Sequence, residues 1–241
     1  MNKKLILTLI IITLNFASIT NDGATVTIGE GVTLRSDGNF VNNGTLTNNG
    51  TLALSGVFSG SNTLSGTNVT YFGDAEVISG IDYNTLNIEG ENTLSGSVEA
   101  HNLIISGDLN LSGFYVDVIN SFVRDGGDIS GDGYIRAQVG GPYLELENIA
   151  DTGFLLSHSD QSVSGYTYRH SGMVDNNERF SLNTYFEYDL ALESEGSTTI
   201  GVAIEDQDVN GMNLEKVSLF HSSDGINWSP LDGVISDNNI T

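Results

Sequence analysis

The chain has no cysteine, only two prolines, one tryptophan and just eight lysine and arginine residues among its 241. Without cysteine no disulfide can stabilise it, so its stability must come from packed strands. With so little proline, its turns depend on glycine, asparagine, aspartate and serine, and glycine alone contributes 29 residues. The 31 acidic residues give a formal net charge of −23, which excludes binding to the phosphates of nucleic acid.

Long apolar runs are also missing, apart from one at the N-terminus. Lys3 and Lys4 precede the apolar run Leu5–Leu14, which is too short to span a bilayer comfortably, and small residues follow it. We predict that residues 1–20 form a secretory signal peptide, with an uncleaved anchor as the alternative. The mature protein is then expected to be secreted or held on the outer cell surface, with no membrane span.

What the sequence does contain is a repeat. The tripeptide Leu/Ile-Ser-Gly begins at positions 54, 64, 78, 94, 105, 111 and 129. Two copies extend to the same pentapeptide, Asn-Thr-Leu-Ser-Gly, at 62–66 and 92–96. A short apolar strand that stops again and again at a polar turn is typical of a β-solenoid.

The strictest register lies in residues 38–61, which hold four consecutive hexapeptides. Their apolar residues Phe40, Leu46, Leu52 and Phe58 are always six apart, whereas a helix would need a spacing of three or four. We predict very short strands joined by sharp turns. The apolar side chains should point inward, with Asn, Thr and Ser facing solvent or stacking on like residues of the next coil.

From about residue 67 the units lengthen, and strand-like segments occur at 69–72, 76–78, 84–88, 96–100, 102–105, 108–111 and 114–118. This spacing predicts a parallel β-helix with three strands per coil and coils on the order of 20–30 residues. We assign residues 21–145 to it and expect residues 119–145 to cap its end, because a terminal strand exposes unpaired backbone groups.

The second half has a different character. From about residue 146 aromatic and charged residues increase, and apolar residues alternate with polar ones in 186–192, 199–204 and 216–221. Such alternation indicates antiparallel sheet with one wet face, so we assign residues 146–241 to a β-sandwich-like domain. Tyr168-Arg169-His170 is expected to pack across strands. The predicted fold class is therefore all-β: a parallel β-helix (β-solenoid) followed by an antiparallel sandwich-like region.

The hexapeptides and the phrases at 83–88 and 105–111 resemble large repetitive adhesin-like β-helix surface proteins of gram-negative bacteria. The segments 204–213 and 219–228 are similar to a β-sandwich that precedes a C-terminal type IX secretion sorting domain. In those proteins the sandwich continues and the sorting domain follows it. We therefore expect this sequence to be a fragment, or else a protein without that sorting signal.

Calcium is the best candidate for a small ligand. Asp206, Asp208, Asn210 and Gly211 match the first half of a Ca²⁺ loop, where oxygens at alternate positions converge and glycine makes the sharp turn. The glutamate expected at the twelfth position is replaced by Val217. The alternative is an Asn-Gly hairpin turn. The resemblance favours that alternative, because the related sandwiches have such a turn here.

The single tryptophan, Trp228, is the candidate for ligand contact. The segment 222–228 resembles the Asp-box, shortened by one residue, which is a structural hairpin and not a catalytic motif. An exposed tryptophan stacks on sugar rings, whereas a tryptophan in a hairpin more often belongs to the core.

Signatures of catalysis are poor. A polysaccharide lyase or hydrolase needs clustered carboxylates with a positioned lysine or arginine. Before residue 120, Arg35 is the only basic residue after the signal segment, the acidic residues are scattered, and the four histidines of the chain stand apart. We predict no catalytic site and no cofactor other than the calcium considered above.

These observations favour a non-catalytic structural or adhesin-like protein. Regular rows of Asn, Thr and Ser would bind extracellular glycans or surface proteins weakly and many times, so that avidity gives the affinity. The alternative is a carbohydrate-active enzyme or its accessory carbohydrate-binding module. A third hypothesis is a left-handed hexapeptide helix of the acyltransferase kind, but that register covers only residues 38–66 and the signal peptide disfavours a cytoplasmic enzyme.

Overall fold

The protein is built almost entirely from β-strands. A computed structural model describes residues 15–16, 18–61, 64, 68–159, 163–172, 184–192, 196–205, 208–209, 218–224, 227–231, 235–236 and 239–240. Within these ranges the residues Ile149–Asp151 form a 3₁₀ turn, η1, and there is no α-helix. The described residues therefore contain no helix long and apolar enough to cross a membrane.

The chain divides into two compact units, Met1–Ser130 and Gly131–Thr241, which we call unit 1 and unit 2. Unit 1 is a stack of parallel strands and unit 2 is built from antiparallel strands, so the predicted fold class is confirmed. The division falls after Ser130, whereas the sequence changes character near residue 146. Most of the predicted signal peptide lies outside the described residues. Its last part contributes short strands to unit 1, and the leader itself stays a prediction.

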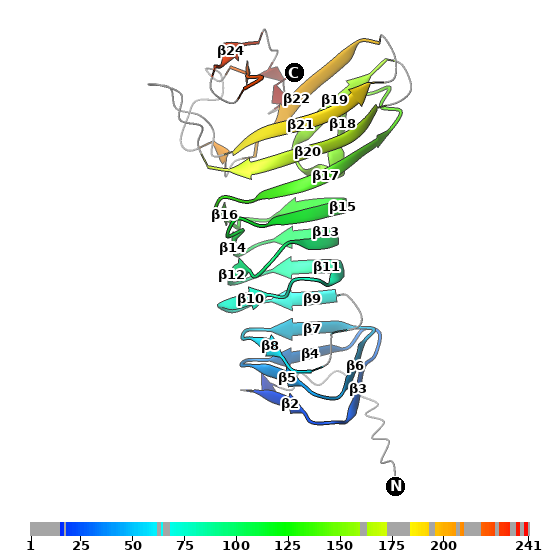
Figure 1. Cartoon of the computed structure of the whole chain (residues 1–241), viewed down its shortest axis with the longest axis vertical. Coiled ribbons are helices and arrows are strands. Elements are labelled where there is room, and N and C mark those ends of the chain that lie inside the picture. The colour runs from blue at the N-terminus through cyan, green and yellow to red at the C-terminus, as the bar shows by residue number, and fades with distance from the viewer. Residues whose placement is uncertain are drawn as a thin grey trace. The chain divides into compact units, whose positions relative to one another are not determined.

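The strands of unit 1 stack as rungs in four sheets (Figure 1). The longest, which we call side A, contains β1 (Asn15–Phe16), β4 (Thr33–Ser36), β7 (Thr51–Leu54), β9 (Asn68–Tyr71), β11 (Asp82–Ile88), β13 (Val98–Ile105) and β15 (Tyr115–Arg124). The others are β2 (Ile19–Asn21), β5 (Phe40–Asn42) and β8 (Phe58–Ser59); β3 (Thr25–Ile28) and β6 (Thr45–Asn48); and β10 (Ala75–Val77), β12 (Glu91–Leu94), β14 (Asp108–Asn110) and β16 (Ile129–Ser130).

One coil of the hexapeptide region consists of three hexapeptides. Phe40 pairs with Phe58, 18 residues later, and their rings stack with centroids 5.4 Å apart. Phe40, Leu46 and Leu52 therefore lie on three different sheets, and all three are buried. Paired residues of side A are 17 to 20 positions apart and those of the sheet β2–β5–β8 are 18 to 21 apart, so the coils lie at or just below the lower end of the predicted 20–30 residues.

The later coils keep a bend within their long strands. In β13 the alternation of buried and outward residues is broken at His101 and Asn102, two consecutive residues that are not buried. The partner strand β15 carries one extra residue at this point, because Ala100 pairs with Val118 but Asn102 pairs with Ser121. Such a bulge turns the strand around a corner without ending it.

The core of unit 1 is a column of like residues stacked from rung to rung. One buried row consists of Leu52, Val69, Leu86, Leu103 and Phe122, in successive pairing register. The predicted piling of aliphatic side chains inside the column is confirmed. Polar stacking also occurs inside: Asn21 Nδ2 donates to Asn42 Oδ1 at 2.8 Å, and both residues are buried. Each amide thus satisfies its neighbour where no water reaches it.

Glycine closes the corners between strands for two different reasons. A side chain at Gly107 would place its Cβ 2.5 Å from the backbone oxygen of Gly90, so the preceding coil leaves no room for one. Gly80 has a φ of +72° and nothing within 4 Å of the same position, so backbone conformation selects glycine there. The glycine of the repeated Leu/Ile-Ser-Gly tripeptide is therefore required for close packing at some positions and for backbone conformation at others.

Replacing each of these glycines by asparagine separates the two constraints. Asparagine tolerates positive φ, so Gly80→Asn should change the free energy of unfolding by less than about 1 kcal/mol. Gly107→Asn should destabilise by about 2 kcal/mol or more, because its Cβ would overlap the backbone of the coil beside it. Urea unfolding followed by circular dichroism measures both. Equal effects at the two positions would contradict this account.

Two tyrosines form a polar pair inside the column. The hydroxyl groups of Tyr71 and Tyr83 lie 3.0 Å apart, and both residues are fully buried. The Tyr83 hydroxyl donates to the Ile78 carbonyl oxygen at 2.7 Å, while the Ile78 N–H donates to the Tyr71 hydroxyl at 3.2 Å. Burial raises the pKa of Tyr71 to about 12 and that of Tyr83 well above its usual range.

This pair predicts a loss of stability in alkali. Because the folded-state pKa is raised from 10.0 to about 12, the contribution of Tyr71 is fully present below pH 10 and falls as pH rises through that interval. The loss from Tyr71 should reach about 2 to 3 kcal/mol. Urea midpoints measured from pH 8 to 12 test it. Tyr71→Phe should have a lower stability at pH 8 but a shallower decline, and a wild-type midpoint constant up to pH 12 would contradict the prediction.

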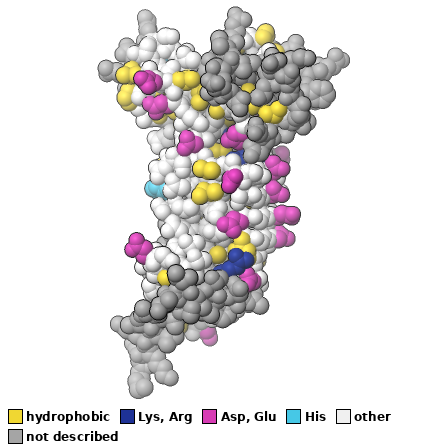
Figure 2. Space-filling view, turned by 180° about the vertical axis from the view of Figure 1, so that it is seen from behind, with side chains coloured by type: hydrophobic (Ala, Val, Ile, Leu, Met, Phe, Trp, Pro, Cys, Tyr) yellow, Lys and Arg dark blue, Asp and Glu magenta, His cyan; other side chains and the backbone are white. Residues whose placement is uncertain are grey.

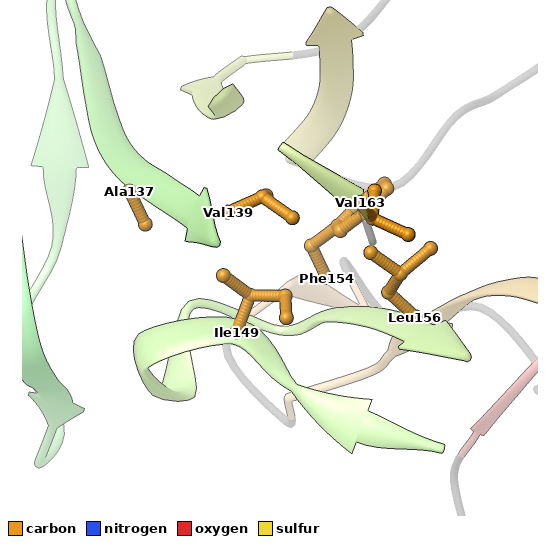
Figure 3. Packing of buried hydrophobic residues seen from close by; sticks show 6 residues of the cluster. All are labelled: Ala137, Val139, Ile149, Phe154, Leu156 and Val163. Atoms are coloured by element: carbon orange, nitrogen blue, oxygen red, sulfur yellow. The ribbon is translucent and has the colours of Figure 1, made fainter. Parts of the chain in front are cut away.

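Unit 2 contains three groups of antiparallel strands. They are β17 (Tyr134–Gly141), β20 (Val163–Ser171) and β21 (Thr184–Leu192); β18 (Glu147–Asn148), β19 (Phe154–His158), β22 (Thr198–Ala203), β26 (Asn239–Ile240) and β25 (Ile235–Ser236); and β23 (Phe220–His221) with β24 (Ser229–Pro230). The first two groups enclose a core of Ala137, Val139, Ile149, Phe154, Leu156 and Val163 (Figure 3). This packing of two sheets confirms the sandwich-like region that the alternating segments predicted.

Candidate functional site

The outer surface of side A carries the rows of polar side chains that the sequence predicts. Inward residues such as Val69 and Leu86 are buried, so their neighbours along each strand point outward. A shallow hollow of ≈ 370 Å³ is lined by the outward residues Thr51, Asn68, Thr70, Asn84, Thr85, Asn87 and Ile104 of β7, β9, β11 and β13, together with the buried Val69. We call this surface the polar face.

Hydrogen bonds between coils hold one row of the polar face in place. Asn84 Nδ2 donates to Asn68 Oδ1 at 2.9 Å, and Asn102 Nδ2 donates to the Asn84 carbonyl oxygen at 3.0 Å. Ser121 Oγ continues the row by donating to Asn102 Oδ1 at 3.0 Å. Ordered amides and hydroxyls of this kind present donors and acceptors at fixed positions, which lowers the entropy lost when a ligand binds.

The second outward row is less regular. In pairing register it contains Arg35, Ala53, Thr70, Asn87, Ile104 and Val123. The Arg35 guanidinium lies 3.5 Å from the ring centroid of Phe72 and pairs with Asp37 at 2.9 Å. The uniformly Asn/Thr part of the polar face is therefore confined to the rungs β9 and β11. The prediction of regular polar rows holds for the first row and only in part for the second.

Charged groups border the hollow: Asn87 Nδ2 donates to Glu89 Oε1 at 2.8 Å, and Arg35 lies in the second outward row. None of the residues that line the hollow is ionisable. Figure 2 shows acidic side chains gathered along one edge of unit 1. Glu91 pairs in register with Asp108, and Asp108 Oδ1 accepts a hydrogen bond from the Asp128 N–H at 3.3 Å. This edge repels anionic polymers, while the hollow offers only neutral hydrogen-bonding groups.

Of the predicted calcium ligands, only Asp208 lies within the described residues; Asp206 and Asn210 lie outside them. Asp208 is buried, and its Oδ2 accepts a hydrogen bond from Arg169 Nη2 at 2.8 Å. Arg169 is itself buried and also donates to Glu205 Oε2 at 2.9 Å and to the Thr152 carbonyl oxygen at 2.7 Å. A calcium ion here would have to share Asp208 with a guanidinium. Calcium binding stays a prediction.

The described part of the chain contains no group of three histidine, aspartate or glutamate side chains placed to hold a metal ion. What the sequence did not reveal is the role of Arg169, which joins β20 to two other segments of unit 2. Its flanking residues Tyr168 and His170 point to the opposite face, where they pack against Tyr134 and Tyr185. The prediction that Tyr168-Arg169-His170 packs across strands is confirmed.

Trp228, the predicted ligand-contact residue, is half-buried and lies just before β24. The hairpin that contains it is closed by Asp224, whose Oδ1 accepts from the Asn227 N–H at 2.8 Å and whose Oδ2 accepts from Asn227 Nδ2 at 2.7 Å. Ser222 Oγ also donates to Asp224 at 2.9 Å. The aspartate thus organises a turn, as in the structural Asp-box. Contact between Trp228 and sugar stays a prediction.

Removing Arg169 should be far more destabilising than removing another arginine of the same sheet. Arg169→Met leaves the buried Asp208 carboxylate without its guanidinium, which should lower the free energy of unfolding by about 3 to 5 kcal/mol. The matched control Arg136→Met, on the opposite face of β17, should lower it by less than about 1 kcal/mol. Trp228 fluorescence during urea unfolding reports on unit 2. Similar losses for the two variants would refute the proposed role of Arg169.

Comparison with known proteins finds no matching family model, no matching curated protein and no matching solved structure. The resemblance to adhesin-like surface proteins and to sandwiches of the type IX system therefore gains no support from these comparisons. What is established is the β-solenoid with its antiparallel companion unit.

Proposed function

We propose that the protein is a non-catalytic, cell-surface or secreted structural protein whose polar face binds neutral glycans. The observation that carries this proposal is the hydrogen-bonded row Asn68–Asn84–Asn102–Ser121, which fixes amide and hydroxyl groups on four successive rungs. A polysaccharide repeats its hydroxyl groups along its length, as the rungs repeat their side chains. Many weak contacts then add up through avidity.

Two further features support this choice of ligand. The hollow over β9 and β11 offers donors and acceptors but no charge, which suits hydroxyl groups. The net charge of −23 and the acidic edge at Glu91 and Asp108 disfavour uronic acid polymers and nucleic acid. A glycan without charged groups is compatible with both the uncharged hollow and the acidic edge.

The absence of ionisable groups from the lining of the hollow favours binding over catalysis there. Glycoside hydrolysis needs a pair of carboxyl groups on either side of the bond that breaks, and lyases need a base within reach of the substrate. Export through the predicted signal peptide, and a relationship with proteins of the type IX system, belong to this proposal and rest on sequence resemblance alone.

Stepwise removal of outward hydroxyl groups tests the proposal. Retention of the full chain on an immobilised mixed-linkage β-glucan or galactomannan would be measured for Thr51→Ala, Thr70→Ala and Thr85→Ala, singly and together. Because each contact is weak, every single variant should bind less than about threefold more weakly, whereas the triple variant should lose about tenfold or more.

The matched control removes three threonines from other sheets of unit 1, at Thr45, Thr47 and Thr93. Its binding should equal that of the wild type. Triple-variant retention as strong as that of the wild type, or an equal loss in the control, would contradict a role for the polar face.

A further inference from the structure

A second surface, on unit 2, is chemically unlike the polar face. One face of the sheet β17–β20–β21 covers the core, which includes Val139 and Val163 (Figure 3). The opposite face, which we call the tyrosine face, carries Tyr134, Arg136 and Gln138 from β17, Tyr166, Tyr168 and His170 from β20, and Tyr185, Glu187 and Asp189 from β21. Four of these side chains are tyrosines, while the buried apolar core lies on the other side of the sheet.

The rings of the tyrosine face contact one another across the strands. Tyr134 meets Tyr168 edge to face with ring centroids 5.3 Å apart, and Tyr166 lies 6.4 Å from Tyr168. His170 stacks parallel on Tyr185 at 4.5 Å. Cross-strand aromatic pairs stabilise each other, so the rings are held in place before any ligand arrives. Tyr166, at 38% relative exposure, is the ring most open to solvent.

Polar groups of both signs lie among these rings. Glu187 pairs in register with Tyr168, and Asp189 pairs with Tyr166. The Glu187 side chain is 65% exposed, and its Oε2 lies 3.3 Å from His170 Nε2. Burial lowers the pKa of His170 despite the neighbouring Glu187 carboxylate, so the imidazole stays mainly neutral at neutral pH. Ring faces and carboxylate acceptors are thus interleaved along one flat surface.

We infer that the tyrosine face binds a neutral polysaccharide chain. The face of an aromatic ring is electron-rich and attracts the partially positive C–H groups of a pyranose ring. Glu187 and Asp189 accept strong hydrogen bonds from the sugar hydroxyl groups, because their acceptor oxygens are charged. Gln138 and Arg136 supply donors on the same surface.

Charge decides between the ligand classes that tyrosines can bind. Anionic glycans are disfavoured by the net charge of −23 and by the two carboxylates on the tyrosine face. A cationic peptide would form ion pairs with the two carboxylates and stack its cationic groups on the rings. However, the Arg136 guanidinium lies 4.9 Å from the centroid of Tyr166, so a second cation at this ring would meet like-charge repulsion, which a neutral sugar does not. A glycan without charge uses the rings and the acceptors together.

Affinity electrophoresis of the full chain through gels that contain mixed-linkage β-glucan, galactomannan or neutral arabinoxylan tests the inference. At least one gel should retard the wild type, and Tyr166→Ala should raise the apparent Kd by about tenfold, which corresponds to the loss of one stacked ring. The matched control is Tyr188→Ala, on the other face of β21 and 40% exposed, which should change the Kd by less than about twofold.

A second variant, with side chains of nearly unchanged shape, distinguishes lost binding from misfolding. Glu187→Gln combined with Asp189→Asn keeps the shape of the side chains and removes the charged acceptors, so binding should weaken by about fivefold or more. Circular dichroism and thermal melting confirm that each variant is folded.

Three results would overturn the inference: no retardation in any of the neutral gels, unchanged retardation of Tyr166→Ala, or binding of poly-lysine that exceeds binding of every neutral glycan and disappears in salt. The inference uses no residue of unit 1. Once the wild type is retarded, the threonine variants of the polar face and the tyrosine variants show separately which of the two surfaces binds the glycan.

Discussion

The close approach of successive backbones is the constraint on which unit 1 depends. Parallel strands hydrogen-bonded at about 4.8 Å leave no space for a side chain where two corners meet, as at Gly107 above Gly90. Each coil must therefore repeat the corner of the coil before it. The same spacing brings like residues into contact, so Leu52 stacks on Val69 inside the column and Asn84 bonds to Asn68 outside it. The same repeat therefore produces both the stacked apolar core and the hydrogen-bonded polar row on the surface.

The two units provide partners for their buried polar groups in different ways. Unit 1 pairs some of its buried amides between coils, as Asn21 does with Asn42, and its interior also holds the hydroxyl pair of Tyr71 and Tyr83, in which each hydroxyl has a partner. Unit 2 has no repeat to rely on, and it concentrates buried charge at one point, where Arg169 meets Asp208 and Glu205. Arg169 thereby connects β20 to the segments that carry Asp208 and Glu205, and loss of one partner would leave the other charge buried without compensation.

The same contrast separates the two candidate surfaces. The polar face owes its order to neighbouring coils and offers neutral groups in a row. The tyrosine face owes its order to cross-strand ring contacts such as Tyr134 on Tyr168, and it combines rings with carboxylates. The first surface repeats the same groups from coil to coil, whereas the second gathers different groups from three strands.

The sequence by itself determined the all-β class, the stacked apolar column and the wet antiparallel sheets, because six-residue and two-residue periods can be read without knowing which segments meet. It placed the coil length only within a broad range, because whether a coil needs 17 residues or 21 depends on how closely its corners pack against the next coil. Nor did it separate Gly107 from Gly80, which look alike in the repeat but differ in what surrounds them. Only the tertiary structure paired Arg169 with Asp208 and gathered nine distant side chains on the tyrosine face. Such contacts join residues far apart in the chain, and no local period records them.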